Sequence, residues 1–196
     1  MSLLFNIADE KPNIEGLQYL PDYITGDNEA TLIQAIDSQP WITDLKRRVQ
    51  HYGYRYDYKA RAVNADAYLG ELPEWLQALT QQLYTDKIFS ELPDQVIVNE
   101  YMSGQGISAH IDCVPCFAET IASLSLGSDC IMQFHNPQSG QKCEQVLERR
   151  SLVILSGAAR YEWTHAIPAR KSDIIQGIKI ERSRRLSLTF RKMLLK

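Results

Sequence analysis

The strongest constraint on the fold is a series of short apolar segments that follow one another closely through the second half of the chain. They are rich in β-branched and aromatic residues, and glycines or prolines separate several of them, as is typical of strands. Strands at such close spacing predict a barrel or sandwich, of which a jelly roll is the simplest closed form. The expected strands are residues 95–101, 119–126, 130–135, 144–148, 150–155, 163–167 and 184–191.

The first part of the chain, to about residue 90, is expected to mix two helices with one strand. Asp27 can cap the first helix, and Pro73 suits the first turn of the second. Between them, HYGYRYDY (51–58) has a tyrosine at every second position, which predicts a strand with its tyrosines on one face. These tyrosines are Tyr52, Tyr54, Tyr56 and Tyr58. The apolar faces of the helices are Leu32, Ile33 and Ile36, and Trp75, Leu76, Leu79 and Leu83.

The bulk composition indicates an ordinary globular protein, 44% hydrophobic and 23% charged over 196 residues. The chain has no internal repeat or Gly/Ser linker, so we expect one domain, residues 1–196, with the jelly-roll core in about 91–196 and supporting elements in about 1–90. The sequence contains no apolar run long enough to cross a membrane, and its N-terminus lacks the pattern of a secretory signal. A cytoplasmic protein is therefore expected.

Charge is unevenly distributed along the chain, although the formal net charge is only −3. Acidic residues dominate up to Asp44, whereas basic residues dominate from Arg150 onward. The net charge argues against a uniformly basic nucleic-acid binder, but such polarity can create a local surface that attracts anions. Ordinary solvated surface explains the same pattern equally well.

The cysteines do not resemble a disulfide framework at this chain length. Cys113 and Cys116 form a CxxC pair, but a zinc site would usually show a second tight pair, and Cys130 and Cys143 stand apart. A thioredoxin-like pair would open a helix after a strand, which the surrounding sequence does not suggest. We therefore expect reduced thiols.

The segment His110-Ile111-Asp112 indicates a metal site. Residues i and i+2 of a strand project to the same side, so His110 and Asp112 offer an imidazole and a carboxylate to one point. His165, in YEWTHAIP, is the natural third ligand. Two histidines and one carboxylate on one face of an octahedron leave three positions open, as in non-haem iron oxygenases. HxD alone is a weak signal, and a surface His110 with a core His165 is the alternative.

The C-terminal segment RLSLTFR (185–191) adds a second indication. Its apolar residues share one strand face suited to a core, and its polar residues, Arg185 and Arg191 among them, share the other. Arginines directed into a barrel need anionic partners, and a dicarboxylate supplies them because guanidinium binds carboxylate in a bidentate fork. Asn99 and Tyr101 also share a strand face and offer neutral donors to the same carboxylates. An exposed edge strand with solvated arginines is the alternative.

Four spaced elements, taken in order, resemble the signature of the AlkB family of dioxygenases. They are Asn99-x-Tyr101, His110-x-Asp112, His165, and Arg185 with Arg191. RSLVILSGAARYEWTHAI and RRLSLTFRK are also similar to that family, and the likeness covers roughly residues 40–192. The resemblance implies a mainly β fold with flanking helices, a double-stranded β-helix (jelly roll) preceded by an N-terminal nucleotide-recognition lid.

The resemblance also implies cofactors and a reaction. Iron(II) would be bound by His110, Asp112 and His165. The distal carboxylate of 2-oxoglutarate would pair with Arg185, while Asn99, Tyr101 and Arg191 assist. Such an enzyme uses O2 and 2-oxoglutarate to hydroxylate a substrate C–H bond, and a hydroxylated N-methyl group leaves as formaldehyde. A non-catalytic metal-binding jelly roll and a zinc hydrolase are the alternatives from other classes, and neither needs a dicarboxylate clamp.

The residues that follow Asp112 bear on the substrate. The family's bacterial repair enzyme has acidic residues just after its HxD that help select a damaged base, whereas this chain has Cys113-Val114-Pro115-Cys116. The segments RRVQHYGY, GQGISAHID and ERRSLVIL look closer to the family's hydroxylase of a modified tRNA wobble uridine. A nucleic-acid partner is therefore expected, with tRNA favoured. Repair of alkylated DNA or RNA bases is the alternative, and a protein substrate stays open.

Basic residues interleave with the tyrosines of segment 51–58, which would supply cations for phosphates and rings for stacked bases. We expect Arg48, Tyr52 and Tyr54 to face the substrate. The alternative is a tyrosine-rich strand packed on the core with its basic residues outward.

Overall fold

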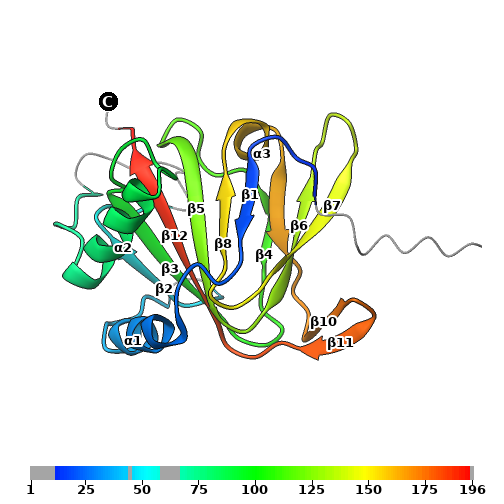
Figure 1. Cartoon of the computed structure of the whole chain (residues 1–196), viewed down its shortest axis with the longest axis horizontal. Helices are drawn as coiled ribbons and strands as arrows, with labels where there is room; N and C mark the ends of the chain where they lie inside the picture. The colour runs from blue at the N-terminus through cyan, green and yellow to red at the C-terminus, as the bar shows by residue number, and fades with distance from the viewer. Residues whose placement is uncertain (1–11, 44–45, 58–66, 195–196) are drawn as a thin grey trace, which may run out of the picture.

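The computed structural model describes residues 12–43, 46–57 and 67–194. Within these ranges the chain forms two facing antiparallel sheets, a separate hairpin and three helices (Figure 1). The larger sheet has the strand order β1-β8-β5-β12-β3-β2, the smaller sheet has the order β4-β9-β6-β7, and β10 and β11 form the hairpin. This mainly β architecture with flanking helices confirms the predicted jelly roll.

The elements have the following bounds in chain order. They are β1 (Leu17–Leu20), α1 (Gly26–Asp37), β2 (Val49–Tyr52), α2 (Glu74–Thr85), β3 (Gln95–Tyr101), β4 (Ile107–His110), β5 (Phe117–Gly127), β6 (Cys130–His135), β7 (Lys142–Leu147), β8 (Leu152–Leu155), α3 (Gly157–Tyr161), β9 (Thr164–Ile167), β10 (Ser172–Ile175), β11 (Ile178–Glu181) and β12 (Arg185–Met193). All seven strands predicted in the second half are present, with ends shifted by a few residues. The sequence reading missed β1, β4, β10 and β11.

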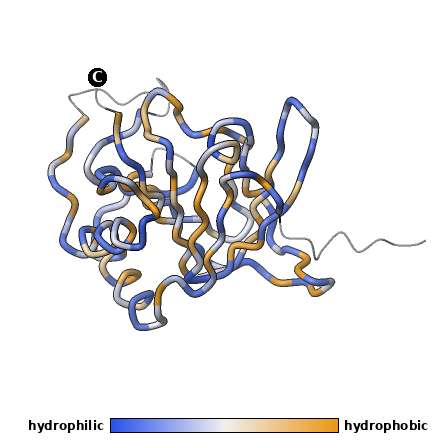
Figure 2. The backbone as a smooth tube through the Cα atoms, turned by 45° about the horizontal axis from the view of Figure 1, so that its top comes forward, coloured by the Kyte–Doolittle hydropathy of each residue, from blue (hydrophilic) through white to orange (hydrophobic). Residues whose placement is uncertain are grey.

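Strand β12 separates two apolar cores. Leu186, Leu188 and Phe190 pack toward α1 and α2, in a cluster completed by side chains of β3, β5 and the two helices. A second cluster fills the space between the sheets and includes Ile121, Val153 and Phe134. Hydrophobic and hydrophilic positions are accordingly interleaved along the strands in Figure 2. The large sheet is thus covered by helices on one face and opposed by the small sheet on the other.

The tyrosine-rich segment 51–58 is not one strand, which corrects the prediction. Strand β2 ends at Tyr52 because Gly53 adopts a φ of +74°, in the left-handed region that favours glycine. Tyr52 packs with the helix-side core, whereas Tyr54 and Tyr56 pack with the core between the sheets. Tyr58 lies outside the described residues. The turn at Gly53 therefore distributes the tyrosines over two sides of the sheet.

Both predicted helices form, but their caps differ from the expectation. The N-cap of α1 is Thr25, whose side chain accepts a hydrogen bond from the Asn28 backbone N–H, and Asp27 lies in the first turn instead. The acidic Asp27 still suits that turn, because the helix dipole favours negative charge there. Pro73 is the N-cap residue of α2 rather than part of its first turn. Among the described residues, no helix is both long and apolar enough to cross a membrane.

Candidate active site

His110 and His165 lie directly opposite each other on neighbouring strands. Strand β4 pairs antiparallel with β9, His110 is the register partner of His165, and the two ring centroids are 4.4 Å apart. Opposed residues of an antiparallel pair project to the same face, so the pairing brings these distant positions to one point. Asp112 follows the end of β4, and its Oδ1 is 3.9 Å from His110 Nε2. The three potential ligand atoms all lie within 4.8 Å of one another, close enough to bind one metal ion.

The contacts around these three groups suit them to bind a metal. The Nδ1 of His110 lies 2.8 Å from the Ser108 backbone oxygen, and an N–H donated there leaves Nε2 free as a ligand. Burial lowers the pKa of His165 to about 4, so its ring is neutral. Burial alone would raise the pKa of Asp112, but the cations around it, led by Arg191, hold that pKa well below its usual range. The donor set of two neutral imidazoles and a carboxylate fits iron(II).

A cavity of about 840 Å³ opens between the two sheets beside this triad. Its walls include Asn99 and Tyr101 of β3 and Arg191 of β12, as the strand alternation predicted. Arg191 Nη2 lies 3.3 Å from Asp112 Oδ1, and Nη1 donates to the Gln95 side chain. The cavity is therefore lined both by His110, Asp112 and His165 and by three of the four residues that are expected to bind 2-oxoglutarate.

Arg185, the fourth of these residues, lies at the opposite end of β12 from Arg191. Its guanidinium carbon is 5.5 Å from the centroid of the Tyr101 ring, and its Nη2 donates to Ser125 Oγ at 2.8 Å. Its Nε and Nη1 are buried without a hydrogen-bond partner among the described residues, as is Arg191 Nε. Buried guanidinium atoms without partners are costly, so an acidic ligand would compensate them. These orphaned donors fit 2-oxoglutarate, which carries two carboxylates.

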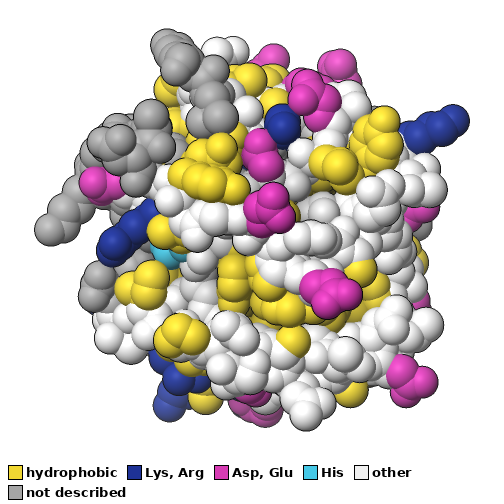
Figure 3. Space-filling view, turned by 90° about the vertical axis from the view of Figure 1, so that its left-hand side faces the viewer, with side chains coloured by type: hydrophobic (Ala, Val, Ile, Leu, Met, Phe, Trp, Pro, Cys, Tyr) yellow, Lys and Arg dark blue, Asp and Glu magenta, His cyan; other side chains and the backbone are white. Residues whose placement is uncertain are grey.

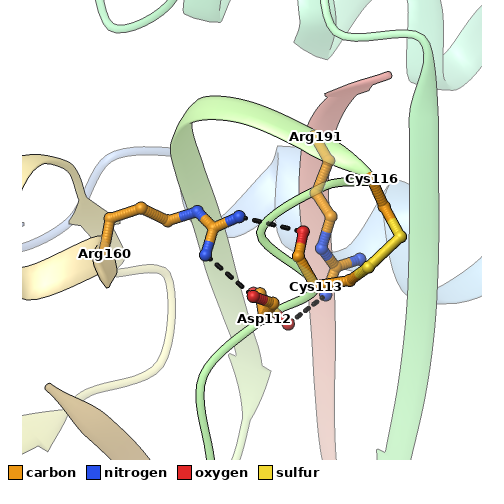
Figure 4. Close-up of a disulfide and its surroundings, with 5 residues drawn as sticks. All are labelled: Asp112, Cys113, Cys116, Arg160 and Arg191. Carbon is orange, nitrogen blue, oxygen red and sulfur yellow. Dashed lines mark hydrogen bonds and ion pairs between the residues drawn. A yellow bond between two sulfur atoms is a disulfide. The ribbon is translucent and has the colours of Figure 1, made fainter. Parts of the chain in front are cut away.

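The loop after Asp112 contains a disulfide between Cys113 and Cys116, which corrects the prediction of reduced thiols (Figure 4). The turn brings the two Cα atoms within 5.3 Å, a separation that a disulfide spans readily. Cys130 and Cys143 are free, as expected. The disulfide closes a tight loop directly beside Asp112, one of the three residues that could hold a metal ion.

Arg160 of α3 holds the same loop and was missed by the sequence reading. It is 2% exposed and donates to the backbone oxygens of Asp112 and Cys113 at 2.9 and 3.2 Å (Figure 4). A basic residue within the otherwise apolar GAARY, between two strands, was a signal that could have found it. Arg160 and Arg191 approach Asp112 from α3 and β12, which fixes both its backbone and its carboxylate.

The three residues expected in the substrate lid do not line the cavity. Arg48 binds the buried Glu100 with two hydrogen bonds of 2.5 and 2.7 Å and lies over the Trp41 ring. Tyr52 contacts Trp75 edge-on, and Tyr54 contacts Tyr68. Arg47 and Tyr56 line the cavity instead. Alternation explains the arginines, because it sends the neighbours Arg47 and Arg48 to opposite sides of the sheet. The tyrosines differ because the turn at Gly53 interrupts the strand.

The fold and this site define a class of protein, and comparison of the chain with known protein families identifies that class. The profile of the 2OG-Fe(II) oxygenase superfamily matches residues 16–191. The chain belongs to this superfamily, whose members require iron(II), 2-oxoglutarate and O2, and it is a dioxygenase. Its relatives place it among the AlkB-like members.

The similarity to curated relatives extends over most of this chain, but the fraction of each relative's length that it covers varies. It is 38% identical to "Uncharacterized protein L905" of Acanthamoeba polyphaga mimivirus over 99% of this chain and 92% of that protein. It is 40% identical to "Alkylated DNA repair protein ALKBH8 homolog" of Arabidopsis thaliana, over 96% of this chain and 61% of that protein. It is 35% identical to the "tRNA (carboxymethyluridine(34)-5-O)-methyltransferase ALKBH8" of Mus musculus and covers 30% of that protein.

Solved structures support the fold alone. OsALKBH1 matches with a TM-score of 0.72 at 17% identity, over 93% of this chain and 99% of that one. A prolyl-4-hydroxylase of Pseudomonas putida matches with a TM-score of 0.57 at 13% identity, over 91% of this chain and 93% of that one. The same architecture therefore occurs in a protein named as an AlkB homologue and in a prolyl hydroxylase, and the substrate must be argued from the site.

Proposed function

We propose that this chain hydroxylates or demethylates a modified nucleobase, with tRNA as the favoured substrate, and that His110, Asp112 and His165 hold its iron(II). The observation that carries the proposal is the pairing of His110 with His165 beside Asp112, at the wall of a cavity large enough for a co-substrate and a base. Part of the proposal is that residues 1–196 act as one catalytic domain in the cytoplasm.

Asn99, Tyr101, Arg185 and Arg191 are the residues that would bind 2-oxoglutarate. Iron(II), O2 and 2-oxoglutarate, when bound, supply the oxidation of a substrate C–H bond. The chain keeps both histidines available as ligands and the Asp112 carboxylate ionised beside Arg191. Apolar side chains of Ile121, Val153 and Leu155 form part of the cavity wall, so water is limited where the substrate carbon would lie.

The preference for tRNA has two supports. Several relatives carry names that refer to tRNA, and the likeness to them extends over about nine tenths of this chain. The position after Asp112 is occupied by the disulfide loop, with Val114 about half exposed, rather than by acidic residues that would select a damaged base. Because an anticodon loop already presents its bases unpaired, a small protein can reach a base there without the cost of opening a duplex.

The surface supports a local nucleic-acid contact near the cavity. On the side where α1 and α2 lie, acidic and hydrophobic side chains predominate in the described surface, and basic ones are few (Figure 3). Lys46 and Arg47, by contrast, line the cavity. We therefore propose that the exposed Lys46 makes the phosphate contact beside the cavity, and salt should weaken binding only modestly, because few phosphates are neutralised.

Repair of alkylated bases is the second candidate, because one relative at 40% identity is named an alkylated DNA repair protein. To separate the two, the iron-loaded protein is incubated in parallel with tRNA carrying modified wobble uridines and with N-methylated single-stranded DNA, and products are read by mass spectrometry. The proposal predicts added oxygen on the tRNA. Formaldehyde and restored bases from the DNA, with unchanged tRNA, would establish the repair activity instead. The His110→Ala variant is the negative control for both substrates.

A further inference from the structure

Arg47 lies at the cavity wall next to residues expected to bind 2-oxoglutarate. It precedes β2, whose pairing with β3 places Val49 opposite Asn99. Its Nε donates to Asn99 Oδ1 at 2.9 Å, and its guanidinium carbon is 6.0 Å from the centroid of the Tyr101 ring. Arg47 thus touches one of these side chains directly and lies near the second.

The hydrogen bond from Arg47 determines which end of the Asn99 amide is available to a ligand. A guanidinium group only donates, so it must take the oxygen of the amide, and the two N–H groups of Nδ2 are left for another partner. No described residue accepts a hydrogen bond from Nδ2, and Asn99 lines the cavity. A carboxylate only accepts, so it can bind Asn99 in this orientation but not in the flipped one.

We propose that Arg47 is a positioning residue for 2-oxoglutarate, which holds the Asn99 amide so that Nδ2 donates to a carboxylate of the co-substrate. This inference rests on the proposed binding of 2-oxoglutarate in this cavity. The charge of Arg47 acts in the same direction. The permanently charged groups at the wall, among the described residues, are Lys46, Arg47 and Arg191 against Asp112. An anionic ligand is therefore attracted before any hydrogen bond forms.

The test measures 2-oxoglutarate binding by calorimetry to protein loaded with Mn(II), so that no turnover is needed. Arg47→Met keeps the length of the side chain but removes its donors, so the Asn99 amide is no longer held in place. The Kd for 2-oxoglutarate should rise about tenfold, which corresponds to losing the one hydrogen bond from Asn99 to the ionised ligand. Arg47→Lys keeps the charge without the fork and should still raise the Kd several-fold. Arg55→Met, which removes an exposed arginine of the same segment, is the matched control and should bind as the wild type does.

A double-mutant cycle shows whether Arg47 acts through Asn99. In the Asn99→Ala background, Arg47→Met should raise the Kd by a clearly smaller factor than in the wild type, because the amide that Arg47 orients is gone and only the loss of its charge still acts. In turnover, Arg47→Met should raise the KM for 2-oxoglutarate and leave kcat nearly unchanged. Arg47 is only partly buried, so Arg47→Met and Arg47→Lys should both keep the wild-type unfolding temperature.

Three results would overturn the inference. They are a wild-type Kd in Arg47→Met, full recovery in Arg47→Lys, and independent, multiplying effects of Arg47→Met and Asn99→Ala. With normal wild-type binding, each of these leaves the proposed function intact. A wild-type protein that binds Mn(II) but no 2-oxoglutarate would overturn the proposed function and this inference together.

Discussion

The two faces of the six-stranded sheet differ, although the same strands form both. On β12, Leu186, Leu188 and Phe190 pack under the helices, whereas Ser187, Thr189 and Arg191 face the cavity. The adjacent pair Arg47 and Arg48 divides in the same way. Arg47 reaches Asn99 at the cavity, and Arg48 binds Glu100 under α1, in a network with Arg184 and Asp37. One face supplies stability and the other presents the polar groups of the site, so substitutions on the two faces should separate stability from activity.

The largest expected effect on the cavity side is that of the metal ligands. His110→Ala should reduce the conversion of 2-oxoglutarate to succinate to the background level, because two remaining ligands cannot hold a labile iron well. Succinate formation and bound iron are measured together. The unfolding temperature of the metal-free variant should match that of the wild type. Turnover that survives in this variant, or that strong chelation leaves unaffected, would remove the iron assignment.

Arg185→Ala should raise the apparent KM for 2-oxoglutarate by about 100-fold or more, because losing one partner of a buried charge pair costs about 3–5 kcal/mol. Arg185→Lys should recover only part of this, since lysine lacks the bidentate fork. Initial rates over a range of 2-oxoglutarate concentrations measure the effect. A KM equal to that of the wild type in Arg185→Ala would place the carboxylate clamp elsewhere.

The helix side is tested with Leu188→Ala, which truncates a fully buried side chain. It should lower the free energy of unfolding by about 3 kcal/mol through lost burial and the cavity left behind, while the Kd for 2-oxoglutarate is unchanged. Thr189 is the next residue and faces the cavity, so Thr189→Ala should lower the free energy of unfolding by less. Denaturant unfolding of both variants measures the difference. If both variants lose stability equally, the division between the faces is not as described.

The smallest effect is expected from the ion pairs that tie α1 to the sheet. The hydrogen bond from Arg184 lowers the pKa of Asp37, and that from Arg48 lowers the pKa of Glu100. Because both folded-state pKa values lie below the unfolded ones, this stabilisation is present above the unfolded values and is lost as the pH falls through the folded ones. Arg184→Met should therefore lower Tm slightly at pH 7, and the difference should shrink below about pH 4. A constant difference across this range would mean that packing, not charge, links α1 to β3.

Local pattern was sufficient for much of the fold. Period-two alternation correctly assigned the two sides of β12 and placed Asn99 and Tyr101 together on one face of β3. It failed at segment 51–58, because a periodic pattern does not reveal that Gly53 turns the chain. It also failed to find β4, which has four residues, none of them buried, and so lacks an apolar pattern.

The sequence by itself determined which residue types could form the site: His110, Asp112 and His165 as ligands, and Arg185 and Arg191 as partners of an acidic ligand. These follow from side-chain chemistry and from i, i+2 geometry, which are local. Only the tertiary structure decided the register that sets His110 against His165, the role of Arg160 at the loop after Asp112, and the assignment of Arg47 rather than Arg48 to the cavity. These depend on pairing between strands and packing between distant segments, where the partner of each residue is fixed by long-range register that no local pattern contains.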